Sequence, residues 1–214
     1  MMPATSPPRW QRRADARPQE LLDAALAEFI ERGYVATRLD TVARRAGVAK
    51  ATLYRYYANK FELFKAVVRS AVVAEIDELA ANPAKAASAR EELAALLSAF
   101  FQRIVNSPLS GIPKLVIGEA GNFPEIARFY HDEVIDRARA LVLAALRRGI
   151  ASGEFRAIDA DYGFRIAVAP LLLAIIWKHS FQACEPQPLD FDRYLAAHLD
   201  LLLGGLTAPS AEAA

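Results

Sequence analysis

The chain has 214 residues, 54% of them hydrophobic and 24% charged, which is the composition of a folded protein and not of a disordered one. A single cysteine, Cys184, excludes an internal disulfide and a multi-cysteine metal site. The N-terminal stretch MMPATSPPRWQRR lacks the apolar segment of a secretory signal, and the longest apolar run, residues 166–177, is shorter than the roughly 20 residues of a membrane span. We therefore expect a soluble, cytoplasmic protein with no membrane partner.

The formal net charge of +1 hides an asymmetry along the chain. Residues 1–60 hold eleven Lys and Arg against six Asp and Glu, whereas the remainder holds fifteen against nineteen. This distribution predicts a polyanion-facing first module attached to a body that does not contact the polyanion. Chance clustering of surface charge is the alternative.

The first four predicted helices lie in the basic quarter. One follows Pro18 and ends at Gly33, and a second runs from Thr37 to Gly47 with Asp40 completing a capping box. A short third helix begins near Lys50. The fourth begins at Asn59, with Glu62 three residues on, and ends before Asn82-Pro83.

Further helices are predicted over residues 88–105, 113–119, 124–152, 161–181 and 191–206. Pro170 lies within one of them and should kink it. With no convincing strand, about nine helices predict an all-α fold.

The second and third helices, joined at Gly47, have helix-turn-helix spacing. Leu53, with help from Tyr57, would face the small core. That leaves the remaining side chains of the third helix outside, where hydroxyls and cations are the donors that phosphates and base edges require. From the residues alone, Tyr54 and Tyr56 are equally suited to capping the core.

At these residues the chain resembles the TetR family of bacterial transcriptional regulators. The resemblance is specific over residues 18–65, through F-x-x-x-G-Y-x-A-T-x-x-x-x-V-A-x-x-A-G-V followed by T-L-Y-x-Y-Y-x-x-K. It is weaker over 88–206, where GNFPEIARFYHDEVI is similar to an AefR-like subgroup. The implied organisation is a flexible basic arm (1–17), a helix-turn-helix domain (18–64), a ligand-binding and dimerisation domain (65–206) and a disordered tail (207–214).

The resemblance also implies DNA-binding roles for individual positions. Thr37 and Lys60 would hold phosphates, Thr52, Tyr54 and Tyr56 would meet the DNA backbone, and Lys50, Ala51 and Arg55 would reach bases. Two positions depart from the family pattern: Ala49 stands where a serine N-cap is common, and Tyr57 replaces a phenylalanine. Upstream, four arginines form either a minor-groove arm or a solvated tail, namely Arg9, Arg12, Arg13 and Arg17.

The second domain offers aromatic and polar side chains that either enclose a ligand pocket or fill an ordinary core. The candidates are Phe64, Phe100, Phe101, Arg103, Ile104, Phe129, Tyr130, His131 and Trp177, with His179 as a further orienting group. His131, Asp132 and Glu133 are consecutive on a helix, so we expect them to diverge by about 100° each and not to chelate a metal together. We predict no catalytic residue, no metal and no cofactor.

Two C-terminal helices carry apolar faces that predict a homodimer through a four-helix interface, an arrangement that the resemblance also implies. The interface candidates are Ile166, Leu173, Ile176, Leu195, Leu199, Leu202 and Leu203. The sequence thus indicates a ligand-responsive repressor released from a palindromic operator in double-stranded DNA by a small, largely apolar effector. The alternative is a dimeric DNA-binding regulator with no small-molecule effector, which senses a protein or acts constitutively.

Overall fold

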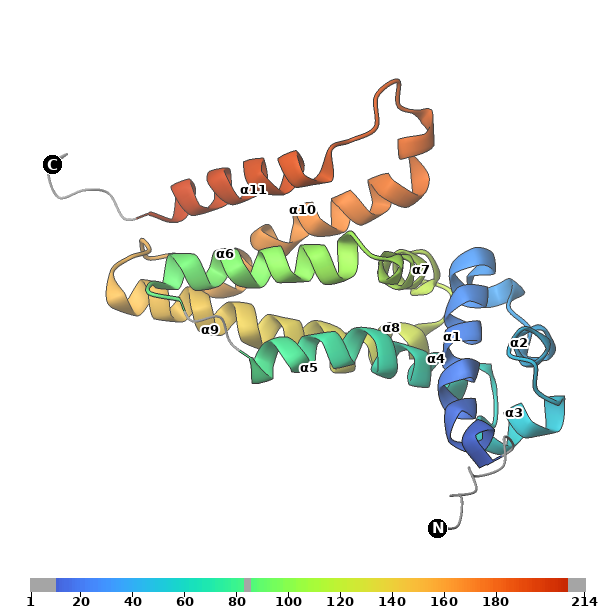
Figure 1. Ribbon diagram of the computed structural model, residues 1–214. Helices are drawn as coiled ribbons and strands as arrows, with labels where there is room; N and C mark the ends of the chain where they lie inside the picture. Colours follow the sequence, from blue (N-terminus) through green and yellow to red (C-terminus); the bar gives the residue numbers. More distant parts are fainter. Residues whose placement is uncertain (1–10, 83–85, 208–214) are drawn as a thin grey trace, which may run out of the picture. The chain divides into compact units, whose positions relative to one another are not determined.

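The computed structural model describes residues 11–82 and 86–207, with side chains from Pro18 onwards (Figure 1). The chain divides into two compact units, Met1–Ser70 and Ala71–Ala214. The division falls a few residues beyond the domain boundary expected at residue 64. Residues 1–10 of the predicted arm and residues 208–214 of the predicted tail lie outside the described residues.

The N-terminal unit contains four helices, α1 (Gln11–Ala36), α2 (Leu39–Arg45), α3 (Lys50–Tyr56) and α4 (Lys60–Val68). Helix α1 begins at Gln11, so the expectation of a flexible arm is wrong for residues 11–17: Pro18 lies inside the helix and does not begin it. At Gly33 the backbone leaves helical geometry with a φ of 76°, where the sequence predicted the helix end.

The core of this unit is an aromatic cluster surrounded by leucines. Phe29 and Tyr34 stack with their ring centroids 5.9 Å apart, and Phe64 meets the two rings edge-on at 5.4 and 5.6 Å. Leu53 and Leu63 are fully buried in the same unit. Leu53 is the one residue of α3 that is buried, so most side chains of this helix lie outside the core.

The turn between α2 and α3 is a Schellman motif built on Gly47. The Val48 N–H donates to the Ala43 carbonyl at 3.0 Å and the Gly47 N–H donates to the Arg44 carbonyl at 3.1 Å. Gly47 has a φ of +66°, a left-handed conformation that glycine adopts without the steric cost that a Cβ adds. The predicted helix-turn-helix is confirmed.

Helix α4 begins as predicted, because Asn59 Oδ1 accepts a hydrogen bond from the Glu62 N–H at 2.9 Å. Helical residues then continue without a loop through the π-helical turn η1 (Arg69–Val73) and α5 (Ala74–Ala81). The expected end before Asn82 is confirmed, since α5 ends at Ala81.

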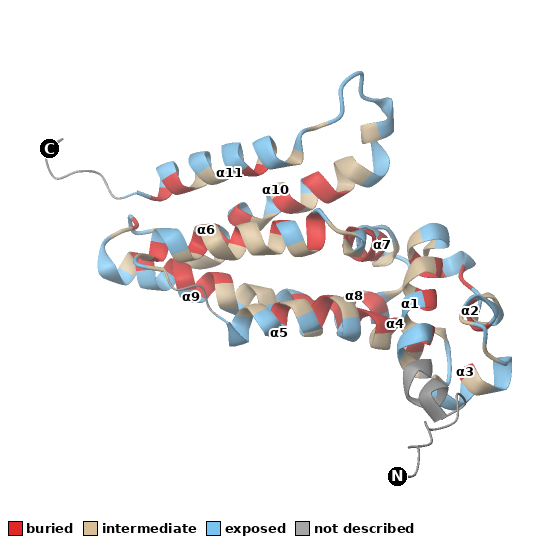
Figure 2. Ribbon diagram, viewed as in Figure 1, coloured by how far each residue is buried: buried red, intermediate tan, exposed pale blue. Residues whose placement is uncertain are grey.

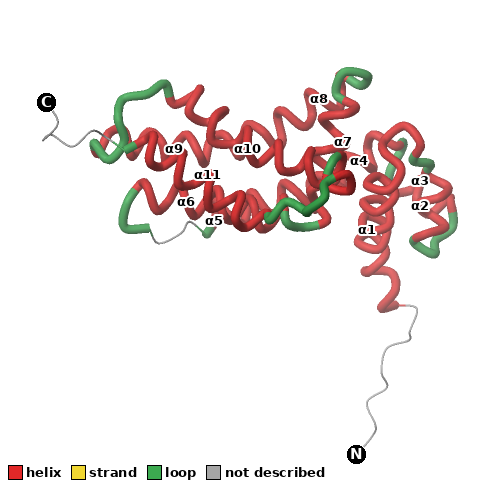
Figure 3. Tube along the Cα trace, turned by 90° about the horizontal axis from the view of Figure 1, so that it is seen from above, coloured by secondary structure: helices red, strands yellow, loops and turns green. Residues whose placement is uncertain are grey.

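The C-terminal unit is also helical. Its elements after α5 are α6 (Ala89–Phe100), η2 (Phe101–Val105), η3 (Pro108–Ser110), α7 (Gly111–Glu119), α8 (Pro124–Tyr130), η4 (His131–Ile135), α9 (Asp136–Ser152), α10 (Ala160–Ser180), η5 (Gln182–Cys184) and α11 (Phe191–Leu206). When π-helical turns are joined to their flanking α-helices, residues 11–82 and 86–207 hold nine helices, as predicted. Figure 3 shows no strand in these ranges, and the one β-bridge there joins Phe155 and Thr207.

Helices α6, α9, α10 and α11 share the main core of this unit, with buried residues on their facing sides (Figure 2). Phe101, Leu146 and Leu171 are fully buried in it. By length and composition α10 is apolar enough to cross a membrane. A core helix passes the same test, and α10 buries Leu171, Ala174 and Ile175 in this cluster.

Candidate functional site

The outer side of α3 is a candidate DNA-binding surface. Lys50, Ala51 and Arg55 are exposed, and Thr52 is half-buried. Tyr54 and Tyr56 remain 44% and 41% exposed, so they do not serve as caps of the core. The structure thus brings hydroxyls and cations together on one short helix whose single buried residue anchors it.

Two cations on this surface are held against aromatic rings. Lys50 Nζ lies 2.9 Å from Asp40 Oδ2 and 5.7 Å from the Tyr54 ring centroid. Its hydrogen bond to Asp40 raises the pKa of the Lys50 ammonium. Arg55 lies 6.0 Å from the Tyr56 ring centroid. Because the Lys50–Asp40 pair is exposed, exchanging Asp40 for a DNA acceptor costs little.

Lys60 has a structural role that the sequence did not reveal. Its ammonium donates to the carbonyls of Tyr34, Val35 and Thr37 at 2.7, 3.0 and 3.2 Å. It also lies 4.6 Å from the Tyr34 ring centroid. Lys60 therefore holds the chain between α1 and α2, and a phosphate contact there would have to replace one of these carbonyls.

Thr37 is placed differently from the prediction. Its side chain is buried, and its hydroxyl lies 2.7 Å from the Gly33 carbonyl and 3.2 Å from the Glu28 carbonyl, to which it donates. The N-cap of α2 is Arg38, without a side-chain capping bond, so the predicted Thr37–Asp40 capping box is wrong. Because the Thr37 hydroxyl donates to carbonyls of α1, it does not accept a bond from the first amides of α2.

Sequence reasoning missed two further cations of this unit. Arg38 and Arg44 are exposed, and neither has an ion pair within residues 18–82 and 86–207. Arg45, next to Arg44, instead bridges Glu31 at 2.6 Å and Glu28 at 3.4 Å. The paired glutamates lie 14 and 17 residues away, so sequence spacing gave no means of telling the paired arginine from its unpaired neighbour.

The C-terminal unit contains a partly open cavity of about 300 Å³. Helices α5, α6, α7, α8, α9 and α10 contribute to its wall, together with η4. Phe100, Val116, Val134, Leu141 and Leu172 are among its lining residues. Within the described part of the chain, the lining residues with polar side-chain atoms are Tyr130 and Arg165.

Of the residues predicted to enclose a pocket, Phe100 and Tyr130 line this cavity and the others do not. Phe64 belongs to the aromatic cluster of the N-terminal unit. Trp177 packs against Phe181, with their ring centroids 5.3 Å apart. Phe101 faces the main core, with its ring 6.4 Å from that of Phe191. Consecutive helical residues such as Phe100 and Phe101 point in different directions, so one lines the cavity and the other packs elsewhere.

The remaining candidates are also placed outside the cavity. Arg103 forms ion pairs with Glu75 and Glu78 at 2.9 and 3.0 Å, while Ile104 and Phe129 are buried. His131 is exposed. His179, the additional candidate, hydrogen-bonds the buried Ser110 hydroxyl at 2.9 Å through Nε2.

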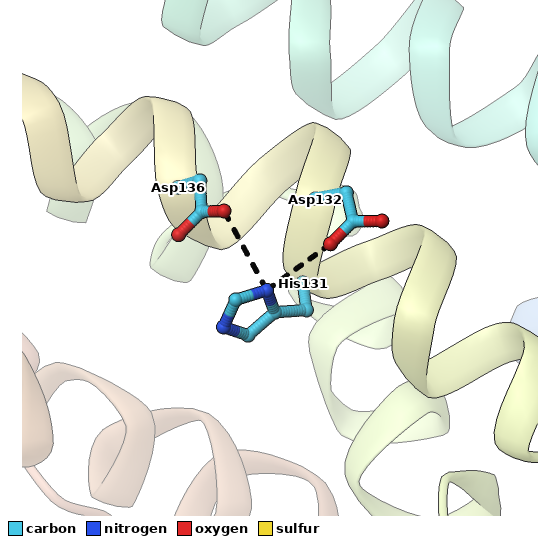
Figure 4. Close-up of side chains that lie close together, drawn as sticks. All are labelled: His131, Asp132 and Asp136. Carbon is cyan, nitrogen blue, oxygen red and sulfur yellow. Dashed lines mark hydrogen bonds and ion pairs between the residues drawn. The ribbon is translucent and has the colours of Figure 1, made fainter.

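His131 nevertheless gathers two carboxylates on the surface (Figure 4). Its Nδ1 lies 3.3 Å from Asp132 Oδ1 and 3.6 Å from Asp136 Oδ2. Neighbours in sequence therefore do meet on this π-helical turn, contrary to our expectation that they diverge, although Glu133 is not part of the group. All three groups are exposed, and an exposed acidic cluster alone does not assign a metal site.

The predicted dimer residues of α10 and α11 differ in burial. Leu195 and Leu203 are buried in the chain's own core, whereas Ile166 and Leu173 are exposed and Ile176, Leu199 and Leu202 are half-buried. Leu201, which the prediction missed, is 77% exposed, and Tyr162 is 67% exposed. Figure 2 shows this exposed side along α11. A groove of about 260 Å³ runs between the two helices beside Tyr162, Ile166 and Leu201.

Comparison with known proteins identifies the same two regions. Residues 21–67 match the model of bacterial regulatory proteins of the tetR family, and residues 83–183 match that of the tetracyclin repressor-like C-terminal domain. The HTH-type transcriptional repressor KstR2 of Mycobacterium tuberculosis is 27% identical over 201 residues, covering 90% of this chain and 94% of that protein. The AefR-like subgroup stays a prediction.

Solved structures share the fold. The transcriptional regulator FadR from Bacillus subtilis, in complex with stearoyl-CoA, superimposes with a TM-score of 0.74 at 21% identity, covering 88% of this chain and 99% of that one. A putative transcriptional regulator from Saccharomonospora viridis, in complex with choline, also gives 0.74, at 23% identity, covering 92% and 100%.

Proposed function

The chain belongs to the TetR family of bacterial transcriptional regulators and is a DNA-binding regulator, not an enzyme, and we propose that it acts as a cytoplasmic, homodimeric repressor. In this proposal a small, largely apolar effector enters the cavity of the C-terminal unit and releases the protein from a palindromic operator. A protein named as a repressor aligns with 90% of this chain, whereas one named as an activator aligns with 42% of it, and the longer alignment supports repression.

The observation that carries the DNA-binding part is the exposed surface of α3. Tyr54 and Tyr56 are 44% and 41% exposed, so their hydroxyls are available to phosphates. Lys50, Ala51 and Arg55 lie on the same helix, and Ala51 is small enough to let the helix approach a groove. We assign phosphate contacts to Tyr54, Tyr56 and Thr52, and base contacts to Lys50, Ala51 and Arg55.

The assignment is tested by comparing single substitutions on a selected operator and on unrelated DNA. Tyr54→Phe removes one hydroxyl and should weaken binding to both DNAs alike, whereas Arg55→Gln should change which sequence is preferred. Arg44→Gln removes an exposed cation from α2 and is the control for the loss of charge alone. An Arg55→Gln variant with the wild-type sequence preference would refute the base contact.

Exposed apolar side chains support the homodimer. Tyr162, Ile166, Leu173 and Leu201 are left uncovered on α10 and α11 of one chain. A second copy related by a two-fold axis would bury these residues and fix the separation of the two α3 helices at about one turn of DNA, roughly 34–36 Å.

The chemistry of the cavity supports an apolar effector. Its lining is hydrocarbon except at Tyr130 and Arg165. A ligand such as stearoyl-CoA, bound by the regulator FadR, carries a long apolar chain that such a wall can desolvate. A compact cation such as choline, bound by the Saccharomonospora viridis protein, would meet Arg165 and no carboxylate in this lining.

Chain continuity offers a route from the cavity to the DNA-binding unit. Ile76 and Leu79 of α5 line the cavity, and helical residues run without a loop from Lys60 to Ala81. A ligand that favours one position of α5 can therefore bias the N-terminal unit, provided that it binds the two states with different affinity.

The alternative, a dimer that senses no small molecule, is tested by thermal denaturation with apolar compounds. A ligand that binds the folded state raises the melting temperature by mass action. The proposal expects such a compound to lower operator affinity while sedimentation still shows a dimer. Effector-driven dissociation would contradict the proposed mechanism.

A further inference from the structure

The cavity of the C-terminal unit combines a hydrocarbon wall with two polar groups, the Tyr130 hydroxyl and the Arg165 guanidinium. We infer that the effector is an amphiphilic acid, with an apolar body, an anionic group bound by Arg165 and a second oxygen that hydrogen-bonds the Tyr130 hydroxyl. This inference rests on the proposed function and names the ligand class of its cavity.

Tyr130 is the last residue of α8 and is only 8% exposed. Its hydroxyl has no hydrogen-bond partner among residues 18–82 and 86–207, although the residue lines a cavity. Burial, with no charged or hydrogen-bonding neighbour, raises the pKa of the Tyr130 phenol. The hydroxyl can therefore donate to or accept from an oxygen of a ligand in the cavity that Tyr130 lines.

Water is a poor substitute for that ligand oxygen. A buried water is held by about three hydrogen bonds to polar groups. The wall of this cavity offers hydrocarbon wherever it is not Tyr130 or Arg165. A ligand that brings its own oxygen, attached to an apolar body, satisfies the hydroxyl and the wall together.

Arg165, on α10, supplies the charge. Arg139 and Arg148 are paired with Asp161 and Glu92, whereas Arg147 has no ion pair among the described residues but does not line the cavity. Arg165 has neither an ion pair nor a side-chain hydrogen bond within the part of the chain that the structure describes, and it is exposed at the edge of the cavity. A guanidinium presents a planar fork that matches a carboxylate or a phosphate.

The size of the cavity limits the apolar body. About 300 Å³ lies at the lower end of the range for small-molecule sites, roughly 300–1,000 Å³. Medium-chain hydroxy acids fit this description, either free or as thioesters whose head group carries phosphate. The shared chemistry is an anion at Arg165 and an oxygen at Tyr130.

Calorimetry on the full chain tests the inference with five probes: decanoate, 3-hydroxydecanoate, 10-hydroxydecanoate, 1-decanol and decanoyl-CoA. Decanoate should bind about tenfold more tightly than 1-decanol because of its charge. One of the two hydroxy acids should bind about threefold to tenfold more tightly than decanoate, the usual gain from one hydrogen bond. Decanoyl-CoA distinguishes a thioester head group from a free acid.

Two substitutions separate the two polar groups. Tyr130→Phe should abolish the advantage of the hydroxy acid, leave decanoate unchanged, and leave the melting temperature of the free protein equal or higher because an unpaired hydroxyl is removed. Arg165→Gln should abolish the advantage of decanoate over 1-decanol and weaken decanoyl-CoA if that is the ligand. Arg147→Gln, at an exposed arginine outside the cavity lining, is the matched control for Arg165→Gln and should behave as wild type.

The outcomes distinguish the inference from the function on which it rests. If 1-decanol binds and releases the operator as well as the acids do, the amphiphilic acid is refuted and the apolar effector survives. If Tyr130→Phe or Arg165→Gln retains every wild-type preference, the corresponding contact is refuted. If none of the probes binds, both the inference and the proposed apolar effector are overturned.

Discussion

Ala49→Ser should stabilise the recognition helix α3. Ala49 is its N-cap, with φ −68° and ψ 144°, the extended conformation that a capping residue needs, yet it has no side chain that can cap. The first amide groups of α3 have no intrahelical partner, and a serine hydroxyl would accept from one of them. A new cap contributes about 1 kcal/mol, so local opening of α3 should become about fivefold rarer.

Hydrogen exchange on the full chain measures this effect. Amides of Lys50–Tyr56 should exchange about fivefold more slowly in Ala49→Ser than in the wild type, in the regime where exchange reports the opening equilibrium. Asn59→Ala is the matched control: it removes the cap of α4, which is present in the structure at 2.9 Å, and should accelerate exchange there by a similar factor. Unchanged exchange in α3, together with faster exchange in α4, would show that a serine at position 49 does not cap α3.

Three further outcomes are expected. Lys60→Ala should lower the free energy of unfolding by about 2 kcal/mol in chemical denaturation, because the ammonium donates to three carbonyls; an unchanged midpoint would assign Lys60 to DNA alone. Leu201→Glu should yield a folded monomer in sedimentation because Leu201 is exposed in one chain, whereas Leu203→Glu should unfold the chain's own core; a Leu201→Glu dimer would exclude this face as the interface. Burial lowers the pKa of His198 from its ordinary 6.5, so the unfolded chain takes up the proton first and stability is lost as the pH falls below about 6.5. His198→Gln retains a donor for the Ala167 carbonyl, 2.9 Å away, and should lose less stability than the wild type between about pH 7.5 and about pH 5.5; equal losses would contradict this origin.

Local signals predicted the helices well because each signal acts within a few residues. Asn59 and Glu62 marked the start of α4, and Gly47 marked the turn before α3. The same short range explains the failure at Thr37. A hydroxyl three residues before an acid reads as a capping box, but in the folded unit it donates to carbonyls at the end of the preceding helix.

Side-chain partners across the fold were not predictable from spacing. Lys60 looked like a phosphate contact, yet its three acceptors lie 23 to 26 residues earlier in the chain. Tyr130 was named as a pocket residue, whereas Arg165 was not, because nothing near Arg165 in sequence shows that its side chain lines the cavity. Helical periodicity identifies an apolar face but not whether that face meets a core, a cavity or a second chain, as Leu203 and Leu201 illustrate.

The central claim, a dimer that reads DNA through α3, is tested most directly by selecting sequences from random duplex DNA with the full-length wild-type protein. We expect an enriched inverted repeat whose half-site centres lie about one helical turn apart, at roughly 34–36 Å, or a multiple of that spacing. We also expect the preferred half-site to change when Arg55 is replaced by glutamine. Failure to enrich any sequence, or enrichment of one without an inverted repeat, would contradict the claim.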